Sequence, residues 1–192
     1  MKILLASSNE HKITEMRNIL KGHQIISLKD LDDHDEVIEN GDTFQQNAFL
    51  KASHFFAKYG YNVLSDDSGL SVDYLNGAPG VYSARYAGED CNQANNRKKL
   101  LKELEGVSDR SAKFVCSLVL IEENGNIRYF TGECLGSILE EETGKTDFGY
   151  DCLFYSNDLR KSFGEATEEE KDKVSHRGQA AEKLLSYLKS LR

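Results

Sequence analysis

Apolar and polar residues follow one another along this chain in runs whose spacing predicts strands and helices in turn. A continuous apolar run at residues 2–6 predicts a buried strand, and apolar positions every three or four residues predict a helix at 9–21. A second helix is predicted to begin at Thr43, which forms a capping-box pattern with Gln46. Strand, polar turn and helix in this order indicate an α/β fold.

The second half of the chain adds longer strands to this pattern. Residues 113–121 and 127–138 are rich in β-branched and aromatic side chains, and Glu-Asn-Gly-Asn separates them, so they predict a long antiparallel hairpin. Helices are predicted at 93–105 and after a second capping-box pattern at Thr167 and Glu170, with an amphipathic helix at the end of the chain. We therefore expect a mixed sheet flanked by helices.

Length and composition narrow the class of protein. The 192 residues, 39% hydrophobic and 29% charged, predict one globular domain over 1–192. No run of 18 apolar residues and no secretory leader is present, so we expect a protein without a membrane partner. Four cysteines lack C-x-x-C spacing, which favours reduced thiols and a cytoplasmic location. A net charge of -8 argues against nucleic-acid binding.

A polar tetrad, Asp66-Asp67-Ser68-Gly69, follows the short apolar run at 62–64. It predicts a carboxylate presented on a glycine turn at the carboxyl end of a strand, where α/β proteins place catalytic groups. Neighbouring side chains on extended backbone point to opposite faces, so the two aspartates cannot serve one centre equally. This geometry leaves open which of them faces a site.

Two polar segments near the N-terminus are candidates for binding an anion and a metal. The turn between the first strand and the first helix suits a phosphate, because helix-end N–H groups are unpaired there; it consists of Ser7, Ser8, Asn9, Glu10, His11 and Lys12. Its alternative role is a simple helix cap with a solvated lysine. Glu39, in the acidic loop 28–42, could bind Mg²⁺ together with Asp67. The alternative is that this loop is merely solvated.

Two further motifs lie in the C-terminal part of the chain. Phe148-Gly149-Tyr150-Asp151 places two aromatic residues around a glycine, which suits stacking on a flat ring, although such residues also fill cores. Ser175-His176-Arg177 follows Lys171 and opens the last helix. This motif predicts either a second site for an anion or a base, or an ordinary helix cap.

Taken in order, these motifs resemble the inosine triphosphate pyrophosphatase family. The resemblance spans nearly the whole chain and rests on a set of short segments: Ser7-Ser8-Asn9 with Lys12, Glu39-x-Gly41-x-Thr43-Phe44, Asn47-Ala48, Asp66-Asp67-Ser68-Gly69, Gly77-Ala78-Pro79-Gly80, Ser83-Ala84-Arg85, Phe148-Gly149-Tyr150-Asp151 and Ser175-His176-Arg177. It implies hydrolysis of dITP, ITP and XTP to the monophosphate and pyrophosphate, with Mg²⁺, by a homodimer. It also implies an elongated fold with a long mixed sheet and an active site in a cleft between two lobes.

The resemblance assigns a role to each candidate residue. Ser7 to Lys12 would hold the phosphates, Glu39 and Asp67 the metal, and Asp67 would also activate water. The residues implied to contact substrate are Ser68, Phe148, Gly149, Tyr150, Asp151, Lys171, His176 and Arg177. His176 and Arg177 are candidate donors to the purine 6-oxo group, which would reject the 6-amino group of ATP.

The chain departs from the family pattern in three places. Ser7-Ser8 replace the usual Thr-Gly, which keeps a hydroxyl but removes a glycine near the phosphates. Thr146-Asp147 replace the glycines that usually precede Phe148, and Cys152 replaces a proline. The first change is expected to affect the phosphate geometry, and the other two are expected to affect base selectivity more than the chemistry.

Three alternatives have weaker support. Leu5-Ala6-Ser7-Ser8 suggests a Maf-like nucleotide pyrophosphatase, but its Ser-Pro-Arg-Arg continuation is absent. A haloacid-dehalogenase-type phosphatase needs D-x-D spacing and would release orthophosphate. A non-catalytic nucleotide-binding module would keep the pocket without turnover, but the presence of Asp67, Glu39 and Lys12 together argues against it.

Overall fold

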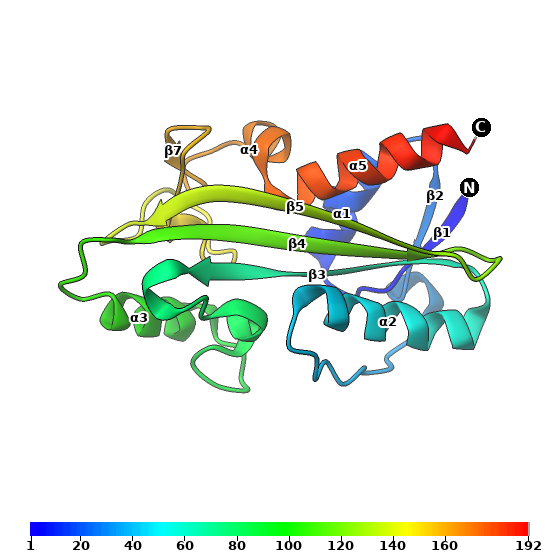
Figure 1. Cartoon of the computed structure of the whole chain (residues 1–192), viewed down its shortest axis with the longest axis horizontal. Helices are drawn as coiled ribbons and strands as arrows, with labels where there is room; N and C mark the ends of the chain where they lie inside the picture. The colour runs from blue at the N-terminus through cyan, green and yellow to red at the C-terminus, as the bar shows by residue number, and fades with distance from the viewer. Residues whose placement is uncertain (192) are drawn as a thin grey trace. The chain divides into compact units, whose positions relative to one another are not determined.

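The computed structural model describes residues 1–191, and these form one mixed β-sheet flanked by helices (Figure 1). The sheet has seven strands in the order β2-β1-β3-β4-β5-β6-β7. The strands are β1 Lys2–Leu5, β2 Gln24–Ser27, β3 Asn62–Val72, β4 Ser111–Ile121, β5 Ile127–Ile138, β6 Phe154–Ser156 and β7 Lys161–Ser162. β1 runs parallel to β2 and β3, whereas β6 is antiparallel to β5 and β7, so the prediction of a mixed α/β sheet is confirmed.

The helices begin where the sequence places their caps. They are α1 Glu10–Ile19, α2 Phe44–Tyr59, α3 Gln93–Glu103, α4 Glu168–Val174 and α5 His176–Ser190, with 3-10 turns at Lys29–Leu31, Asp73–Leu75, Gly80–Arg85 and Asp151–Leu153. Thr43 with Gln46 and Thr167 with Glu170 each form the complete capping box, in which both side chains bond backbone N–H groups. The predicted hairpin is also confirmed, because β4 and β5 are neighbours joined by a turn at 122–126.

Backbone contacts divide the chain into two compact units. The first contains residues 1–67, 116–132 and 177 onwards, and the second contains 68–115 and 133–176. Each unit has a core of its own. The prediction of a single domain over residues 1–192 stays a prediction.

The first unit buries both faces of its sheet under helices. Ile3, Leu5 and Leu64 pack with α1 and α5 on one face, whereas Leu4 and Val63 pack with α2 on the other. Figure 1 shows these helices on opposite sides of β1 and β3. Successive residues of a strand therefore enter different cores, as the two-residue period of a strand requires.

Strand β3 is longer than the sequence predicted. The predicted strand ends at residue 64 before a glycine turn, but β3 continues through the aspartates and Gly69 to Val72. The predicted turn is absent because β3 lies between strands β1 and β4 in the sheet. The continued strand also places Leu70 and Val72, both fully buried, in the core of the second unit. The short strands β2, β6 and β7 were not predicted.

The core of the second unit is aromatic. The Phe114 ring lies 4.6 Å from Phe154 and 5.9 Å from Phe163, measured between ring centroids. Leu100 and Leu104, at the C-terminal end of α3, pack in the same core. This packing fixes α3 and the segment around residue 150 within the unit.

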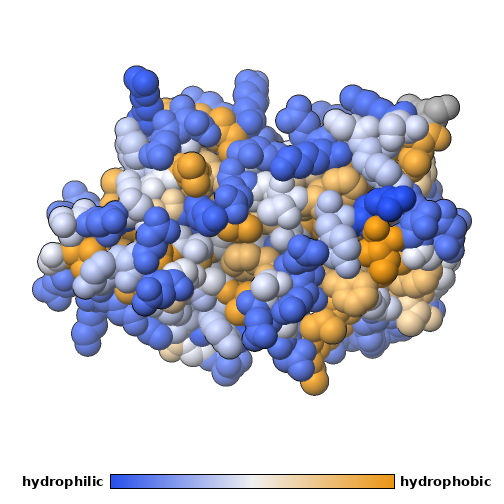
Figure 2. Space-filling view, viewed as in Figure 1, coloured by the Kyte–Doolittle hydropathy of each residue, from blue (hydrophilic) through white to orange (hydrophobic). Residues whose placement is uncertain are grey.

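The face of the molecule drawn in Figure 2 is mainly polar, and the thiols are mostly internal. Hydrophilic side chains cover most of the face drawn in Figure 2, with apolar groups scattered among them. No helix within residues 1–191 is long and apolar enough to cross a membrane. Cys116, Cys134 and Cys152 are buried free thiols and Cys91 is an exposed one, so the cysteines are mostly packed, as predicted.

Candidate active site

The two aspartates of β3 point to opposite faces of the first unit. Asp66 shares its face with Leu64, which packs with α1 and α5. Asp67 shares its face with Ser65, whose hydroxyl donates a hydrogen bond to the Ala48 carbonyl of α2. The predicted divergence is confirmed, and each aspartate has a different set of charged neighbours.

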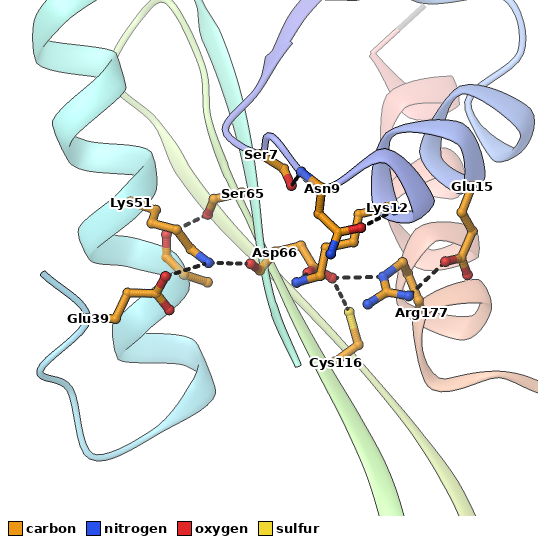
Figure 3. Close-up of polar contacts among 11 residues, drawn as sticks. Ser7, Asn9, Lys12, Glu15, Glu39, Lys51, Ser65, Asp66, Cys116 and Arg177 are labelled. Carbon is orange, nitrogen blue, oxygen red and sulfur yellow. Dashed lines mark hydrogen bonds and ion pairs between the residues drawn. The ribbon is translucent and has the colours of Figure 1, made fainter. Parts of the chain in front are cut away.

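Asp66 is the anionic centre of a buried network (Figure 3). Its Oδ2 atom lies 3.0 Å from Arg177 Nε and accepts a hydrogen bond from Cys116 Sγ at 3.1 Å, while Lys12 Nζ forms an ion pair with Oδ1. Asp66 is only 2% exposed. Burial alone would raise the pKa of this carboxyl, but the charges of Arg177 and Lys12 hold it well below its usual value. Asp66 therefore stays ionised and orients two cations.

Arg177 extends the network to α1. Its Nη1 donates to Glu15 Oε2 at 2.7 Å, and the Arg177 side chain is 4% exposed. The guanidinium thus lies between two carboxylates, Glu15 and Asp66. In this structure Arg177 is part of the charge network that holds Asp66, whereas the resemblance implied a contact with the substrate base.

The turn before α1 is a helix cap, as one of the two interpretations predicted. Asn9 Oδ1 accepts from the Lys12 backbone N–H at 3.2 Å, and Ser7 Oγ accepts from the Asn9 N–H at 3.2 Å. Ser8 and His11 are exposed, and Glu10 is exposed and pairs with Lys29. The same interpretation also predicted a solvated lysine, and this part is wrong. Lys12 Nζ instead contacts Asp66. Binding of phosphates by the segment stays a prediction.

Asp67 combines partial burial with an unsatisfied oxygen. Its Oδ2 atom is buried and has no hydrogen-bond partner within residues 1–191. Burial, opposed by the charge of Lys51 and assisted by that of Glu39, raises the pKa of Asp67 to about 6. Lys51 Nζ lies 3.2 Å from Glu39 Oε1 and donates to the Asp66 carbonyl at 2.7 Å (Figure 3). Glu39, Lys51 and Asp67 therefore form one electrostatic cluster on the α2 face.

Two side chains of this cluster could serve as ligands of a metal ion. The buried, unpartnered Asp67 oxygen and the carboxylate of Glu39 are hard oxygen ligands. No group of three or more His, Cys, Asp or Glu side chains in the described part of the chain could hold a metal ion by itself. Two carboxylates suit Mg²⁺, which is usually bound by one or two carboxylates with water and substrate phosphates completing its coordination.

The acidic loop that carries Glu39 is anchored to α2. Asp33 accepts from Tyr59 Oη at 2.5 Å and pairs with Lys58 Nζ at 2.8 Å, and Asp35 lies 2.9 Å from His54 Nε2. The hydrogen bonds from Lys58, the largest cause, and from Tyr59 lower the pKa of Asp33. The interpretation that the loop is merely solvated is therefore wrong for Asp33, which is 8% exposed.

In the second unit, the 148–151 motif lies beside α4. Lys171 Nζ pairs with Asp151 Oδ2 at 2.5 Å and lies 5.6 Å from the centroid of the Phe148 ring. Tyr150 is a core residue, 4% exposed, whose hydroxyl donates to the Ser83 carbonyl at 2.7 Å. Of the two aromatic residues, the half-buried Phe148 is the one left for contact with a ligand ring.

His176, Ser68 and Cys152 also lie in the second unit. The His176 ring stacks on Phe114 with centroids 4.8 Å apart and 14° between the ring planes. Ser68 is half-buried on β3. Cys152 is 3% exposed, and burial raises the pKa of its thiol to about 11. The cysteine that replaces the family's proline is thus a packing residue.

Sequence reasoning missed Lys51, Cys116 and Glu15. A lysine within a helix resembles any solvated lysine, and only the fold brings Lys51 to Glu39. Cys116 lies in an apolar strand with no polar pattern around it. Glu15 lies three residues after Lys12, on the same side of α1, and this spacing was the one available signal.

Comparison with known proteins identifies the family of this chain. A family model described as the Ham1 family matches residues 3–187. A dITP/XTP pyrophosphatase of Clostridium perfringens is 45% identical over 201 residues, covering 99% of this chain and 98% of the relative. Among solved structures, the Ham1 protein of Staphylococcus aureus is 36% identical with a TM-score of 0.93 and full coverage of both chains. A HAM1 protein from Coxiella burnetii is 39% identical with a TM-score of 0.91, covering 99% of each chain.

Proposed function

We propose, because this chain belongs to the Ham1 family, that it hydrolyses the non-canonical purine nucleotides dITP, ITP and XTP to the monophosphate and pyrophosphate. The names of its relatives, at up to 47% identity, support this activity and give no support to the alternatives considered from the sequence. The observation that carries the proposal is the half-buried Asp67, whose unpartnered oxygen lies in a cluster with Glu39 and Lys51.

In the proposed reaction, water attacks the α-phosphorus of the triphosphate. A bond forms between the water oxygen and this phosphorus, the bond to the bridging oxygen of the β-phosphate breaks, and pyrophosphate leaves. Asp67 takes the proton of the attacking water, for which a pKa near 6 is suitable at neutral pH. The water oxygen thus ends in the monophosphate.

Other residues of the first unit hold the phosphates. Lys12 provides a positive charge on the first turn of α1, beside the backbone N–H groups of the helix end. Asp66 holds Lys12 in place without taking part in the reaction itself. Lys51 balances the negative charges of Glu39 and Asp67. Binding and orientation, more than covalent chemistry, are the protein's main contribution to phosphoryl transfer.

Magnesium is proposed as the cofactor, held by Glu39 and Asp67. When bound, it would neutralise the triphosphate charge and stabilise the transition state. This requirement fits a chain with net charge -8, which would otherwise repel a polyphosphate.

Pyrophosphate release from a panel of triphosphates tests the proposal. We expect ITP, dITP and XTP to be hydrolysed with kcat/KM about 10⁴-fold above that of ATP, because a donor facing the 6-amino group would be left unpaired. Chelation of Mg²⁺ should abolish turnover. Equal rates for ITP and ATP, or release of orthophosphate, would contradict the proposal.

Substitution of Glu39 tests the metal assignment. Glu39→Gln should raise the Mg²⁺ concentration needed for half-maximal activity by about 10- to 100-fold, because one charged oxygen ligand is lost. Glu36→Gln, on the same loop and exposed, is the matched control. If both variants need the same Mg²⁺ concentration as the wild type, Glu39 is not a ligand.

The proposal extends to a cytoplasmic homodimer. Free thiols at four positions within residues 1–191 support a reducing compartment. Tyr74 and Tyr82, each 57% exposed on the second unit, are residues of a type enriched at interfaces. Analytical ultracentrifugation should give the mass of two chains, and a one-chain mass at micromolar concentration would contradict the dimer.

A further inference from the structure

The 146–150 loop of the second unit is held by helix α3. Arg97, the fifth residue of α3, reaches the loop with its guanidinium. Its Nη1 atom donates to the carbonyl oxygens of Asp147 at 3.2 Å and Gly149 at 3.1 Å. Gln93, one turn earlier, accepts the Gly149 N–H through its side-chain oxygen at 2.5 Å. Both polar groups of the Gly149 peptide backbone are therefore bound by α3.

Burial makes the Arg97 contacts hard to replace by water. Arg97 is 4% exposed, although α3 lies at the surface and its neighbours Lys98 and Lys99 are exposed. Glu142 accepts from Arg97 Nε at 2.8 Å and balances the buried charge. A buried cation with a carboxylate partner and two carbonyl acceptors fixes geometry, because removal would leave those groups unpaired.

The anchored backbone surrounds Phe148. This residue lies between the two carbonyls that Arg97 binds, and Gly149 after it has a left-handed φ of 56°, which a side chain would disfavour. Lys171 Nζ lies 5.6 Å from the centroid of the Phe148 ring and pairs with Asp151. Helix α3 thus holds the backbone on either side of Phe148, and Lys171 of α4 contacts the ring.

Arg97 also contacts the side chain of Asp147, a position at which this chain departs from the family pattern. The Asp147 carboxylate, where the family usually has glycine, lies 3.6 Å from Arg97 Nη2 in addition to the carbonyl contact. Because the Asp147 side chain is 98% exposed, Arg97 holds the loop mainly through its two carbonyl contacts.

We propose that Arg97 is a positioning residue that fixes the 146–150 loop and thereby sets how strongly the enzyme discriminates 6-oxopurine from 6-aminopurine triphosphates. This inference rests on the proposed function for its substrate. Arg97 acts through Phe148 and Gly149 and does not itself contact the nucleotide. Its loss should therefore change KM and selectivity more than kcat.

The test compares Arg97→Lys with Lys98→Leu, a control at the adjacent exposed position. Lysine keeps the charge beside Glu142 but cannot donate from the separate nitrogens of a guanidinium fork. Arg97→Lys should raise KM for ITP and lower the ITP to ATP ratio of kcat/KM by about 10- to 100-fold, with kcat for ITP nearly unchanged. Unchanged ratios, or a fall in kcat alone for both nucleotides, would overturn the inference.

Hydrogen–deuterium exchange separates this inference from the proposed function. Peptides covering residues 145–152 should exchange faster in Arg97→Lys than in the wild type and in Lys98→Leu. A wild-type protein inactive on every triphosphate would refute the proposed function, whereas unchanged exchange would refute the anchoring by Arg97. If Arg97→Lys does not fold, Gln93→Ala at an exposed position must show faster exchange and reduced selectivity, and unchanged values would overturn the inference.

Discussion

Asp67→Asn is expected to lower kcat for ITP by about 10²- to 10⁴-fold while leaving the fold intact. Asparagine has nearly the same shape as aspartate but cannot take a proton from water. It is also a weaker ligand for Mg²⁺, so the loss should lie near the upper end of this range. Steady-state pyrophosphate release at saturating Mg²⁺ measures the effect.

The control for Asp67 is Asp73→Asn, an exposed aspartate just after the same strand. This variant should keep wild-type kcat. Thermal unfolding of both variants shows whether the fold is retained. Equal turnover in wild type and Asp67→Asn would remove Asp67 from the mechanism.

Asp66→Asn is expected to reduce the free energy of unfolding by about 3–5 kcal/mol, because it leaves the buried Arg177 and the half-buried Lys12 with one carboxylate fewer. Glu15 still pairs with Arg177, which favours the lower end of the range. Turnover should fall less than in Asp67→Asn, since Asp66 only orients Lys12. Urea unfolding monitored by circular dichroism measures the change.

An exposed ion pair provides the contrast for Asp66. Lys173 and Glu169 lie 2.9 Å apart, but their side chains are 68% and 83% exposed. Glu169→Gln should leave the free energy of unfolding unchanged within error, because solvent screens such pairs. If Asp66→Asn lowers the free energy of unfolding no more than Glu169→Gln does, the stabilising role of the Asp66 network is contradicted.

The contribution of Asp66 also has a predicted pH dependence. Its pKa is lowered in the folded protein, so the stabilisation is fully present above the unfolded value of 3.8 and is lost as the pH falls through the lower folded pKa. The difference in stability between wild type and Asp66→Asn should therefore be fully present at pH 5. It should shrink below about pH 3.8. A difference that instead grows on acidification would contradict the assigned direction.

Local patterns predicted most of the elements and the faces of β3. The capping boxes at Thr43 and Thr167 and the hairpin of β4 and β5 depend on residues close in sequence, so periodicity and caps were sufficient. The divergence of Asp66 and Asp67 followed from strand geometry alone. Strand geometry did not indicate which of the two aspartates is catalytic, because the preference for Asp67 came from the family resemblance.

The remaining features depend on contacts distant in sequence. Asp66 and Arg177 are 111 residues apart, and Asp66 and Cys116 are 50 apart, so no window along the chain reveals their network. The strand through Gly69 was missed for the same reason, since its extension depends on the neighbouring strand β4. Likewise, the anchoring of Asp33 by Lys58 and Tyr59 was invisible in a loop that resembled a solvated acidic run.

Hydrolysis of ITP in ¹⁸O-labelled water tests the central claim most directly. Attack of water on the α-phosphorus at the Asp67 site predicts one ¹⁸O atom in the monophosphate product and none in pyrophosphate. Mass spectrometry of both products after a single turnover gives the answer. Label in pyrophosphate, or in orthophosphate released beside a diphosphate, would contradict the proposed reaction.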